Sequence, residues 1–402
     1  MTLALAPTPA PPVERAPARS SRVHPECRFR APVRSAAVCI PARNEAKRLP
    51  ETLYALSRAV EQAQRKGIVC HVAIALDGCT DGSGALLRAV ARTFPCEIVT
   101  VALPAIGISH AGRARRAAMD LGLEIAALGQ CEGQQEAHAV MTTDADTTVN
   151  ADWIVANTDG LAETDLVAGY VEWDSETPVP ELVYQEAYFD ALHRWRRRID
   201  PVAFDADSPH HKQYGASLAV RGDVYADLGG LPVKPCNEDT ELVRRARLAG
   251  YRVRQDREPK VLTSTRRKGR AEGGFSDAIQ WVENLKARGG QLEVDCPDVL
   301  TESYRASARA RQAFSRSRSG GRNGATECGH IPAKAGVWGN CVGTSLPESE
   351  FEQAWAVSPS ADSFVTRLFE RREPQEAQAA PKVPLDRAVE RLATLMERGV
   401  DL

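Results

Sequence analysis

The chain has 402 residues, of which 43% are hydrophobic and 26% are charged. This is an ordinary globular balance, and the length is enough for one large domain or two smaller ones. A formal net charge of −2 excludes a globally basic protein, so we expect no nucleic-acid partner and only local polyanion sites. No run of about 18 consecutive apolar residues is present, so we expect no integral membrane segment.

The ten cysteines are scattered without CxxC pairs, which is typical of a reduced, cytoplasmic protein. The first residues lack a basic segment ahead of their short apolar stretch, and their prolines would break a signal-peptide helix. Residues 1–35 are rich in Pro, Ala and Arg without a sustained period. This composition predicts a disordered N-terminal tail.

From residue 36 onward, short β-branched runs alternate with segments of helical periodicity. The expected strands are 36–41, 71–76, 97–103 and 137–143. Between the first two strands, apolar residues from Leu49 to Val60 recur at helical spacing, and Gly67 supplies a stop. This repeat predicts an α/β fold with a mainly parallel central sheet flanked by helices.

The alternation of strands and helices continues in the middle of the chain. Strands are expected at 165–173, 215–221 and 251–255, and helices at 181–199 and 237–250. An Arg-, Ser- and Gly-rich stretch at 306–336 predicts a flexible loop, and 384–399 predicts a terminal helix. We therefore expect one domain over 36–300 and a partly flexible C-terminal extension over 301–402.

Polar, turn-forming segments follow three of the predicted strands. PARNEA, DGCTDGSG and DADTTVN come after the first, second and fourth strands. In open parallel sheets, ligands bind beyond the carboxyl ends of the strands, which share one edge. We expect the three segments to meet at that edge and to form the functional site.

Asp144 and Asp146 flank Ala145 at the end of a predicted strand, so their side chains point to the same side. Two carboxylates this close repel each other unless a cation is present. Mg²⁺ and Mn²⁺ prefer oxygen ligands and are often held by one or two carboxylates and substrate phosphates. The alternative is a surface turn in which aspartate accepts backbone hydrogen bonds.

Three further carboxylates also have a structural and a functional interpretation. Asp77 follows a strand and precedes glycines, so it could belong to a turn or could accept a hydrogen bond from a nucleotide base. Glu238 and Asp239 fall in the first turn of a helix, where the helix dipole stabilises negative charge. A carboxylate that faces a site from there can also act as a general base.

Two basic stretches complete the candidate residues. Arginine binds phosphate oxygens in a bidentate manner, so either stretch could hold an anion, although most charge runs are solvent-exposed. The candidates are Arg113 and Arg116 in GRARRAAMD, and Arg266, Arg267 and Arg270 in TRRKGR. His210 and His211 lie in an expected loop, and the sequence assigns them no partner.

Four of these segments, in order, resemble the family 2 glycosyltransferases of the GT-A fold. They are VCIPARNEAKRLPETL, ALDGCTDGSG, TTDADTTVNADWI and NEDTELVRRARLAGYRV, and the resemblance covers about residues 36 to 260. It implies that one set of residues borders the nucleotide pocket and that Asp77 contacts the base. The bordering residues are Pro41, Arg43, Asn44 and Glu45.

The resemblance also implies the chemistry of the site. Asp144 and Asp146 match the family's DxD motif, with Asp146 the direct ligand of Mg²⁺ or Mn²⁺ on the diphosphate of a UDP- or GDP-sugar. Asp239 becomes the catalytic base of an inverting transfer of one sugar to an acceptor hydroxyl, with Glu238 beside the donor. Three arginines could share in holding the diphosphate or an anionic acceptor, namely Arg113, Arg116 and Arg267.

The sequence departs from the family pattern at several points. It has Leu76 and Asp77 where relatives often have two acidic residues, and it lacks both a histidine after the ED helix and the QxxRW signature of processive synthases. Transfer of a single sugar is therefore favoured over polymer synthesis. The alternatives are a retaining enzyme of the phosphoglycerate-glycoside type, a sugar-phosphate nucleotidyltransferase and a catalytically silent sugar-nucleotide-binding protein. Donor sugar, acceptor and oligomeric state are not predicted.

Overall fold

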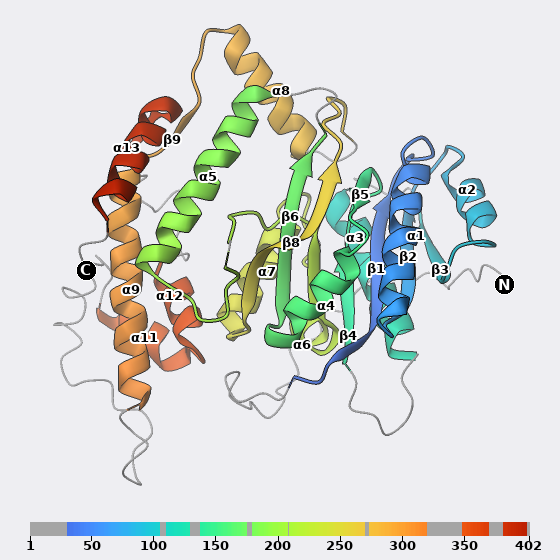
Figure 1. The fold of residues 1–402 in the computed structure, drawn as a ribbon, viewed down its shortest axis with the longest axis horizontal. Coiled ribbons are helices and arrows are strands. Elements are labelled where there is room, and N and C mark those ends of the chain that lie inside the picture. The colour runs from blue at the N-terminus through green and yellow to red at the C-terminus, as the bar shows by residue number, and fades with distance from the viewer. Residues whose placement is uncertain are drawn as a thin grey trace.

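An eight-stranded β-sheet forms the centre of this computed structural model (Figure 1). The structure describes residues 30–104, 110–128, 137–174, 179–207, 209–269, 273–319, 348–369 and 381–399. Most of the expected N-terminal tail, residues 1–29, lies outside the described residues. The first strand begins at Val33, slightly before the predicted start of order at residue 36.

The strand order in the sheet is β3-β2-β1-β4-β7-β6-β8-β5. Only β5 and β7 run against the direction of the other six strands. The strands are β1 Val33–Ala42, β2 Val69–Asp77, β3 Glu97–Leu103, β4 Ala137–Thr142, β5 Thr147–Val149, β6 Leu166–Trp173, β7 Leu218–Arg221 and β8 Val253–Thr263. The expected fold class, an α/β fold with a mainly parallel central sheet flanked by helices, is confirmed.

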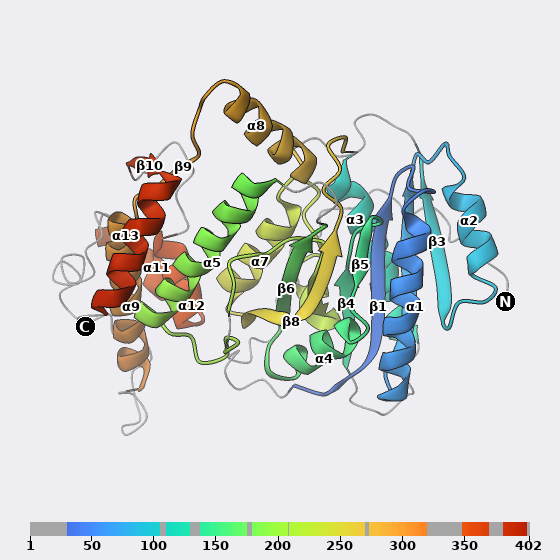
Figure 2. The same ribbon diagram turned by 45° about the horizontal axis from the view of Figure 1, so that its top comes forward.

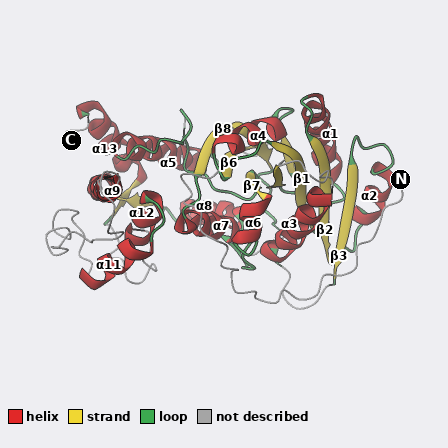
Figure 3. Ribbon diagram, turned by 90° about the horizontal axis from the view of Figure 1, so that it is seen from below, coloured by secondary structure: helices red, strands yellow, loops and turns green. Residues whose placement is uncertain are grey.

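Helices cover both faces of the sheet, as Figure 3 shows from below. Alternate residues of a strand point to opposite faces, so Val38 and Ile40 of β1 belong to one apolar layer and Ala37 and Cys39 to the other. The first layer contains α1 (Leu49–Arg65), α2 (Ser83–Val90) and α4 (Trp153–Glu163), and the second contains α3 (Ala111–Leu128), α6 (Gly222–Asp227) and α7 (Glu238–Ala249).

A group of helices packs beside the sheet at the β8 side (Figures 1 and 2). It contains α5 (Pro180–Ile199), α8 (Phe275–Ala287), α9 (Pro297–Ser319) and α13 (Leu385–Arg398), with a small sheet of β9 (Glu293–Asp295) and β10 (Lys382–Pro384). The helix α13 lies where the terminal helix was expected. Because α9 crosses residue 300, the C-terminal extension shares a core with the segment before it.

The loop expected from residue 306 is helical as far as Ser319 in the structure. Phe314 of α9 is buried and stacks on Phe364 with ring centroids 5.1 Å apart. Its partners come from α11 (Glu348–Val357) and α12 (Ala361–Phe369), far along the chain. Apolar burial therefore overrides the polar composition of this segment, and residues 320–336 of the expected loop lie outside the described residues.

The longest helices that the structure describes are polar on much of their surface. The helices α5 and α9 have 20 and 23 residues, and both contain several arginines. Within the described ranges, no helix combines the length and the apolar composition needed to cross a membrane.

Candidate active site

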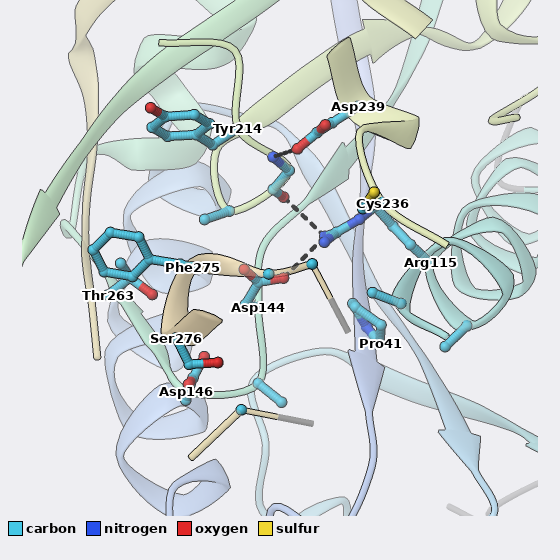
Figure 4. A pocket seen from close by; sticks show the side chains of 18 of the residues that line it. Pro41, Arg115, Asp144, Asp146, Tyr214, Cys236, Asp239, Thr263, Phe275 and Ser276 are labelled. Atoms are coloured by element: carbon cyan, nitrogen blue, oxygen red, sulfur yellow. Dashed lines mark hydrogen bonds and ion pairs between the residues drawn. The ribbon is translucent and has the colours of Figure 1, made fainter. Parts of the chain in front are cut away.

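A cavity of about 430 Å³ lies at the carboxyl edge of the sheet (Figure 4). Its lining includes the last residues of four parallel strands, namely Ala42 of β1, Asp77 of β2, Trp173 of β6 and Thr263 of β8. The loop after β4 and the first turn of α7 complete it. The three polar segments expected to share this edge therefore meet there, because their strands run in the same direction.

The cavity has an excess of acidic side chains. Among the described residues its lining contains six carboxylates and three arginines. The carboxylates are Glu45, Asp77, Asp144, Asp146, Glu238 and Asp239, and the arginines are Arg43, Arg115 and Arg266. A diphosphate entering this cavity would need additional positive charge, because like charges repel strongly in a partly desolvated site.

Asp77 is the last residue of β2, is buried and lines the cavity. Its Oδ1 lies 3.1 Å from Nη1 of Arg113, and Nη2 of Arg113 donates to the Pro104 carbonyl at 3.1 Å. Burial raises the pKa of Asp77, while the charges of Arg113, Arg43 and His110 oppose that rise. Arg113 therefore fixes the orientation of a carboxylate that faces the cavity.

The end of β1 and the loop after it contribute some residues to the cavity lining and others to contacts with a neighbouring loop. Pro41, Arg43 and Glu45 line the cavity, and Glu45 Oε1 accepts a hydrogen bond of 2.7 Å from Arg266. Asn44 lies outside the cavity lining and has a positive φ of 54°. Its Oδ1 accepts from the backbone N–H of Thr80 at 2.8 Å, so its side chain joins this loop to the loop after β2.

Asp144 and Asp146 both face the cavity and each is paired with an arginine. Asp144 Oδ1 lies 2.9 Å from Arg115 Nη1, and Asp146 Oδ2 lies 3.2 Å from Arg266 Nε. Burial, with smaller contributions from Asp144 and Glu45, raises the pKa of Asp146 to about 6, even though Arg266 opposes the rise. Asp146 therefore takes up a proton at a higher pH than an exposed aspartate.

Arg115 connects the two acidic motifs and was not predicted from the sequence. It is 6% exposed and binds Glu238 through Nε at 3.0 Å in addition to Asp144. Its Nη1 also donates to the Gly215 carbonyl at 3.0 Å. Ala114 and Ala118 are buried on α3, so the apolar periodicity of this helix was the signal that places Arg115 on the inner face.

Glu238 and Asp239 lie in the first turn of α7, as expected. The Oδ2 atom of Asp239 accepts from the Gly215 N–H at 2.6 Å, and its Oδ1 accepts from the Thr240 N–H at 2.7 Å. Burial and the neighbouring charge of Glu238 raise the pKa of Asp239, against the opposing charge of Arg115. Asp239 is thus an oriented carboxylate with a higher proton affinity than an exposed aspartate.

Three of the candidate arginines, Arg113, Arg116 and Arg267, lie outside the cavity lining, and of these Arg113 contacts a lining carboxylate, Asp77. Arg116 pairs with Asp120 at 2.5 Å and donates to the carbonyl of Leu231 at 2.8 Å, so it ties α3 to the loop after α6. Arg267 pairs with Glu283 of α8 at 2.8 Å. In the same basic stretch, Arg266 is the residue that reaches the cavity, and Arg270 lies outside the described residues.

The residues around Asp146 fit a divalent cation whose ligands come partly from the protein and partly from a substrate. Over the described part of the chain, no group of three His, Cys, Asp or Glu side chains is arranged to hold a metal ion. Asp144 and Asp146 nevertheless offer carboxylate oxygens, which are the ligands that Mg²⁺ and Mn²⁺ prefer. Mg²⁺ is commonly held by one or two carboxylates together with phosphate oxygens, and this pattern matches the cavity.

The end of the cavity at β6 and β8 is aromatic. The rings of Trp173 and Phe275 have centroids 4.7 Å apart, and Tyr214 lies beside Asp239 (Figure 4). The strand order puts this end four strands away from Asp77, which is about 19 Å at the usual spacing between strands. The cavity therefore has an acidic and basic end at β1 and β2 and an aromatic end at β6 and β8.

No family model matches the sequence, and no curated protein matches it. Among solved structures, residues 1–349 of Staphylococcus aureus TarS in complex with UDP-GlcNAc align with 15% identity and a TM-score of 0.40, covering 84% of this chain and 91% of that chain. The mannosyltransferase PcManGT from Pyrobaculum calidifontis, in complex with GDP-Man and Mn²⁺, aligns with 16% identity and a TM-score of 0.39, covering 85% and 90%. Likeness at this level does not assign an activity to the chain.

Proposed function

We propose that the protein is a glycosyltransferase that moves one sugar from a UDP- or GDP-sugar to an acceptor hydroxyl with inversion of configuration. One observation carries this proposal. Asp77, Asp146 and Asp239 come from three separate elements and line one cavity at the carboxyl edge of the sheet. This reaction requires three groups: one that accepts a hydrogen bond from the nucleotide base, one that binds the cation, and one that takes the proton from the acceptor hydroxyl.

The donor would lie with its base at the β2 end of the cavity. Asp77, held by Arg113, would accept a hydrogen bond from an N–H of the base, between Pro41 and Arg43. The diphosphate would then lie near Asp144 and Asp146. Arg266 is positioned to share in binding the diphosphate, because its guanidinium lies within ion-pair distance of Glu45 and Asp146 and arginine binds phosphate oxygens well.

Asp146, with Asp144 beside it, would hold Mg²⁺ or Mn²⁺ on the diphosphate. When bound, the cation supplies positive charge that stabilises the departing nucleoside diphosphate. The excess of carboxylates in the lining supports this assignment. The protein itself orients both carboxylates through ion pairs. Arg266 pairs with Asp146, and Arg115 pairs with Asp144.

Asp239 would act as the general base. The acceptor oxygen forms a bond to the anomeric carbon while the bond from that carbon to the diphosphate oxygen breaks, and the hydroxyl proton moves to Asp239. Its raised pKa favours proton uptake. The backbone N–H groups of Gly215 and Thr240 each hold one oxygen of Asp239, which fixes the direction of its free lone pairs.

The aromatic end of the cavity would receive the acceptor. Trp173, Phe275 and Tyr214 offer apolar ring surface in the same cavity as Asp239. Arg115 and Arg266 are already engaged by carboxylates on the donor side. We therefore propose an uncharged, hydroxyl-bearing acceptor such as a glycoside, in preference to a phosphorylated or carboxylated one.

The test is a donor and acceptor screen. Purified protein is incubated with UDP- and GDP-sugars, with Mn²⁺ or Mg²⁺, and with aryl glycosides or 3-phosphoglycerate as acceptors. We expect release of nucleoside diphosphate, a product one sugar heavier than the neutral acceptor, and an inverted anomeric signal by NMR. Pyrophosphate release from a nucleoside triphosphate, with every sugar nucleotide left intact, would contradict the proposal, as would donor binding without any transfer or hydrolysis.

A further inference from the structure

His211 lies between two carboxylates on the same face of α5. Its Nδ1 atom is 2.8 Å from Asp190 Oδ1, and its Nε2 atom is 3.3 Å from Glu186 Oε2. Glu186 and Asp190 are four residues apart on the helix, so their side chains are neighbours on its surface. All three side chains are largely buried, with exposed fractions of 20% or less.

This geometry favours a His211 ring in which both nitrogens carry a proton, because Nδ1 is hydrogen-bonded to Asp190 and Nε2 faces Glu186 as an ion pair without hydrogen-bond geometry. A neutral imidazole has one N–H and one lone pair, so it would turn a lone pair toward a carboxylate. The doubly protonated ring instead turns an N–H toward each carboxylate and places a positive charge between them. The hydrogen bonds and charges of Asp190 and Glu186 outweigh burial and raise the pKa of His211.

The other charged and titratable groups around His211 do not reverse this preference. Lys212 lies 3.1 Å from Glu186, and Arg257 of β8 lies 2.6 Å from Asp190. The hydroxyl of Tyr170 in β6 donates to Asp190 at 3.1 Å, and that of Tyr214 donates to Glu186 at 3.3 Å. His210 Nε2 lies 2.9 Å from the Asp256 carbonyl, and burial lowers the pKa of His210 to about 4. Asp190 therefore keeps its Oδ1 on the His211 ring, and Glu186 shares its Oε2 between His211 and Lys212.

Residues 211–215 connect this acidic pair to the proposed base. Lys212 donates to the Val171 carbonyl at 2.6 Å, and Tyr214 reaches Glu186, so the start of the segment is anchored on α5 and β6. At the other end, the Gly215 N–H donates to Asp239 and the Gly215 carbonyl accepts from Arg115. A change at His211 can therefore reach Asp239 through five residues of backbone.

At the second end of this segment, the backbone of Gly215 packs closely against Arg115. A Cβ atom at this position would lie 2.5 Å from Cζ of Arg115, so only glycine lets the backbone approach both Arg115 and Asp239. A small displacement of the segment would therefore alter the hydrogen bond between Gly215 and Asp239.

We propose that His211 is a positioning residue whose doubly protonated ring, held by Glu186 and Asp190, fixes residues 211–215 so that Gly215 keeps Asp239 oriented toward the acceptor. This inference rests on the proposed function for the role of Asp239 as base. Deprotonation of His211 removes its ion pair with Glu186 and loosens the segment. Activity then falls as the pH rises through the titration of His211.

The first test needs no substrate. In ¹⁵N-labelled protein, the His211 ring and the Gly215 amide are followed by NMR from pH 5.5 to 9. We expect both signals to titrate with a common midpoint above the ordinary histidine value of about 6.5. Glu186→Gln should lower both midpoints by about one pH unit, because one of the two opposite charges is lost. A Gly215 signal that does not respond to the titration of His211 would overturn the inference.

The second test uses transfer, or hydrolysis of the donor, on the same proteins. His211→Gln should lower kcat by about tenfold, because the base is less well placed, while the KM for the donor stays within about twofold. It should also abolish the alkaline decline, which Glu186→Gln should move to lower pH. His71→Gln, at the start of β2 and far from the cavity edge, is the matched control and should leave the profile unchanged.

These two tests separate the inference from the proposed function. If the wild type turns over no sugar nucleotide while Gly215 still follows His211, the proposed function fails and the coupling of His211 to Asp239 stands. If transfer occurs but both variants keep the wild-type pH profile, the positioning role is wrong. Thermal unfolding of each variant confirms that a loss of kcat is not a loss of fold.

Discussion

Arg115 Nη1 lies 2.9 Å from Asp144 Oδ1, and this partly buried ion pair joins the loop after β4 to helix α3. The same guanidinium binds Glu238 at 3.0 Å, so one cation connects the two acidic motifs of the cavity. Their separation along the chain is more than ninety residues, and no local interaction could align them. The geometry of the proposed site therefore depends on the position of Arg115.

Replacing Arg115 by methionine should destabilise the protein. The change keeps an unbranched apolar stem but leaves Asp144 and Glu238 without their shared cation, and loss of one partner of a buried pair costs about 3–5 kcal/mol. The free energy of unfolding, measured by urea denaturation, checks this. Arg267→Met is the control, because its pair with Glu283 is exposed and should contribute less than about 1 kcal/mol. Equal losses in both variants would contradict the assignment.

Replacing Asp146 by asparagine should make the binding of the donor less dependent on the metal ion. We expect the Mn²⁺-dependent gain in affinity for a UDP- or GDP-sugar to fall by tenfold or more, because a carboxylate ligand is lost. Calorimetric titration of the donor with and without Mn²⁺ measures this gain. Asp152→Asn, an exposed carboxylate just before α4, should keep the wild-type gain. A gain that survives in Asp146→Asn would remove Asp146 from the cation site.

The acidic limb of the pH profile should report Asp239. The raised pKa of this carboxylate means that it is protonated, and unable to accept a proton, at a higher pH than an ordinary aspartate. Activity should therefore be lost as the pH falls, with a midpoint above 3.8. Asp239→Asn should lower kcat by about 10²–10⁴-fold, while donor binding persists. A variant that retains wild-type kcat would exclude Asp239 as the base.

Truncating Phe275 should affect the acceptor and spare the donor. Phe275→Ala removes one ring of the aromatic end, and loss of such a contact is worth about 1–3 kcal/mol, which is roughly tenfold or more in the KM for an aryl glycoside. Donor affinity should not change. Trp281→Ala is a matched control, because Trp281 is on the same helix, is 58% exposed and lies outside the cavity lining. A donor KM that rises in Phe275→Ala would place this ring at the donor instead.

The sequence predicted the order of strands and helices because their signals are local. Apolar periodicity placed α1 and α7 within a residue or two of their observed bounds, and it located Asp77, Asp144 and Asp239 at strand ends or in a first helical turn. The parallel direction of the strands then brought these residues to one edge. The position of these residues in the site therefore follows from the apolar periodicity of the sequence and the parallel direction of the strands.

Other features depended on contacts between distant segments. The strand β7 runs antiparallel between β4 and β6, and the expected strand at 215–221 begins only at Leu218, because Gly215 turns toward Asp239. The helix α9 continues beyond residue 306 because Phe314 finds an apolar partner in α12. These outcomes depend on partners that a local pattern does not contain.

The sequence by itself determined the α/β class, the edge at which polar residues gather and the acidic character of that edge. Only the tertiary structure decided that Arg115 and Arg266, and neither Arg116 nor Arg267, enter the cavity. It also decided that His211 meets two carboxylates of α5. The physical reason is the same in each case: periodicity identifies the buried face of an element, but the packing of helices against the sheet determines which charges on that face come within bonding distance.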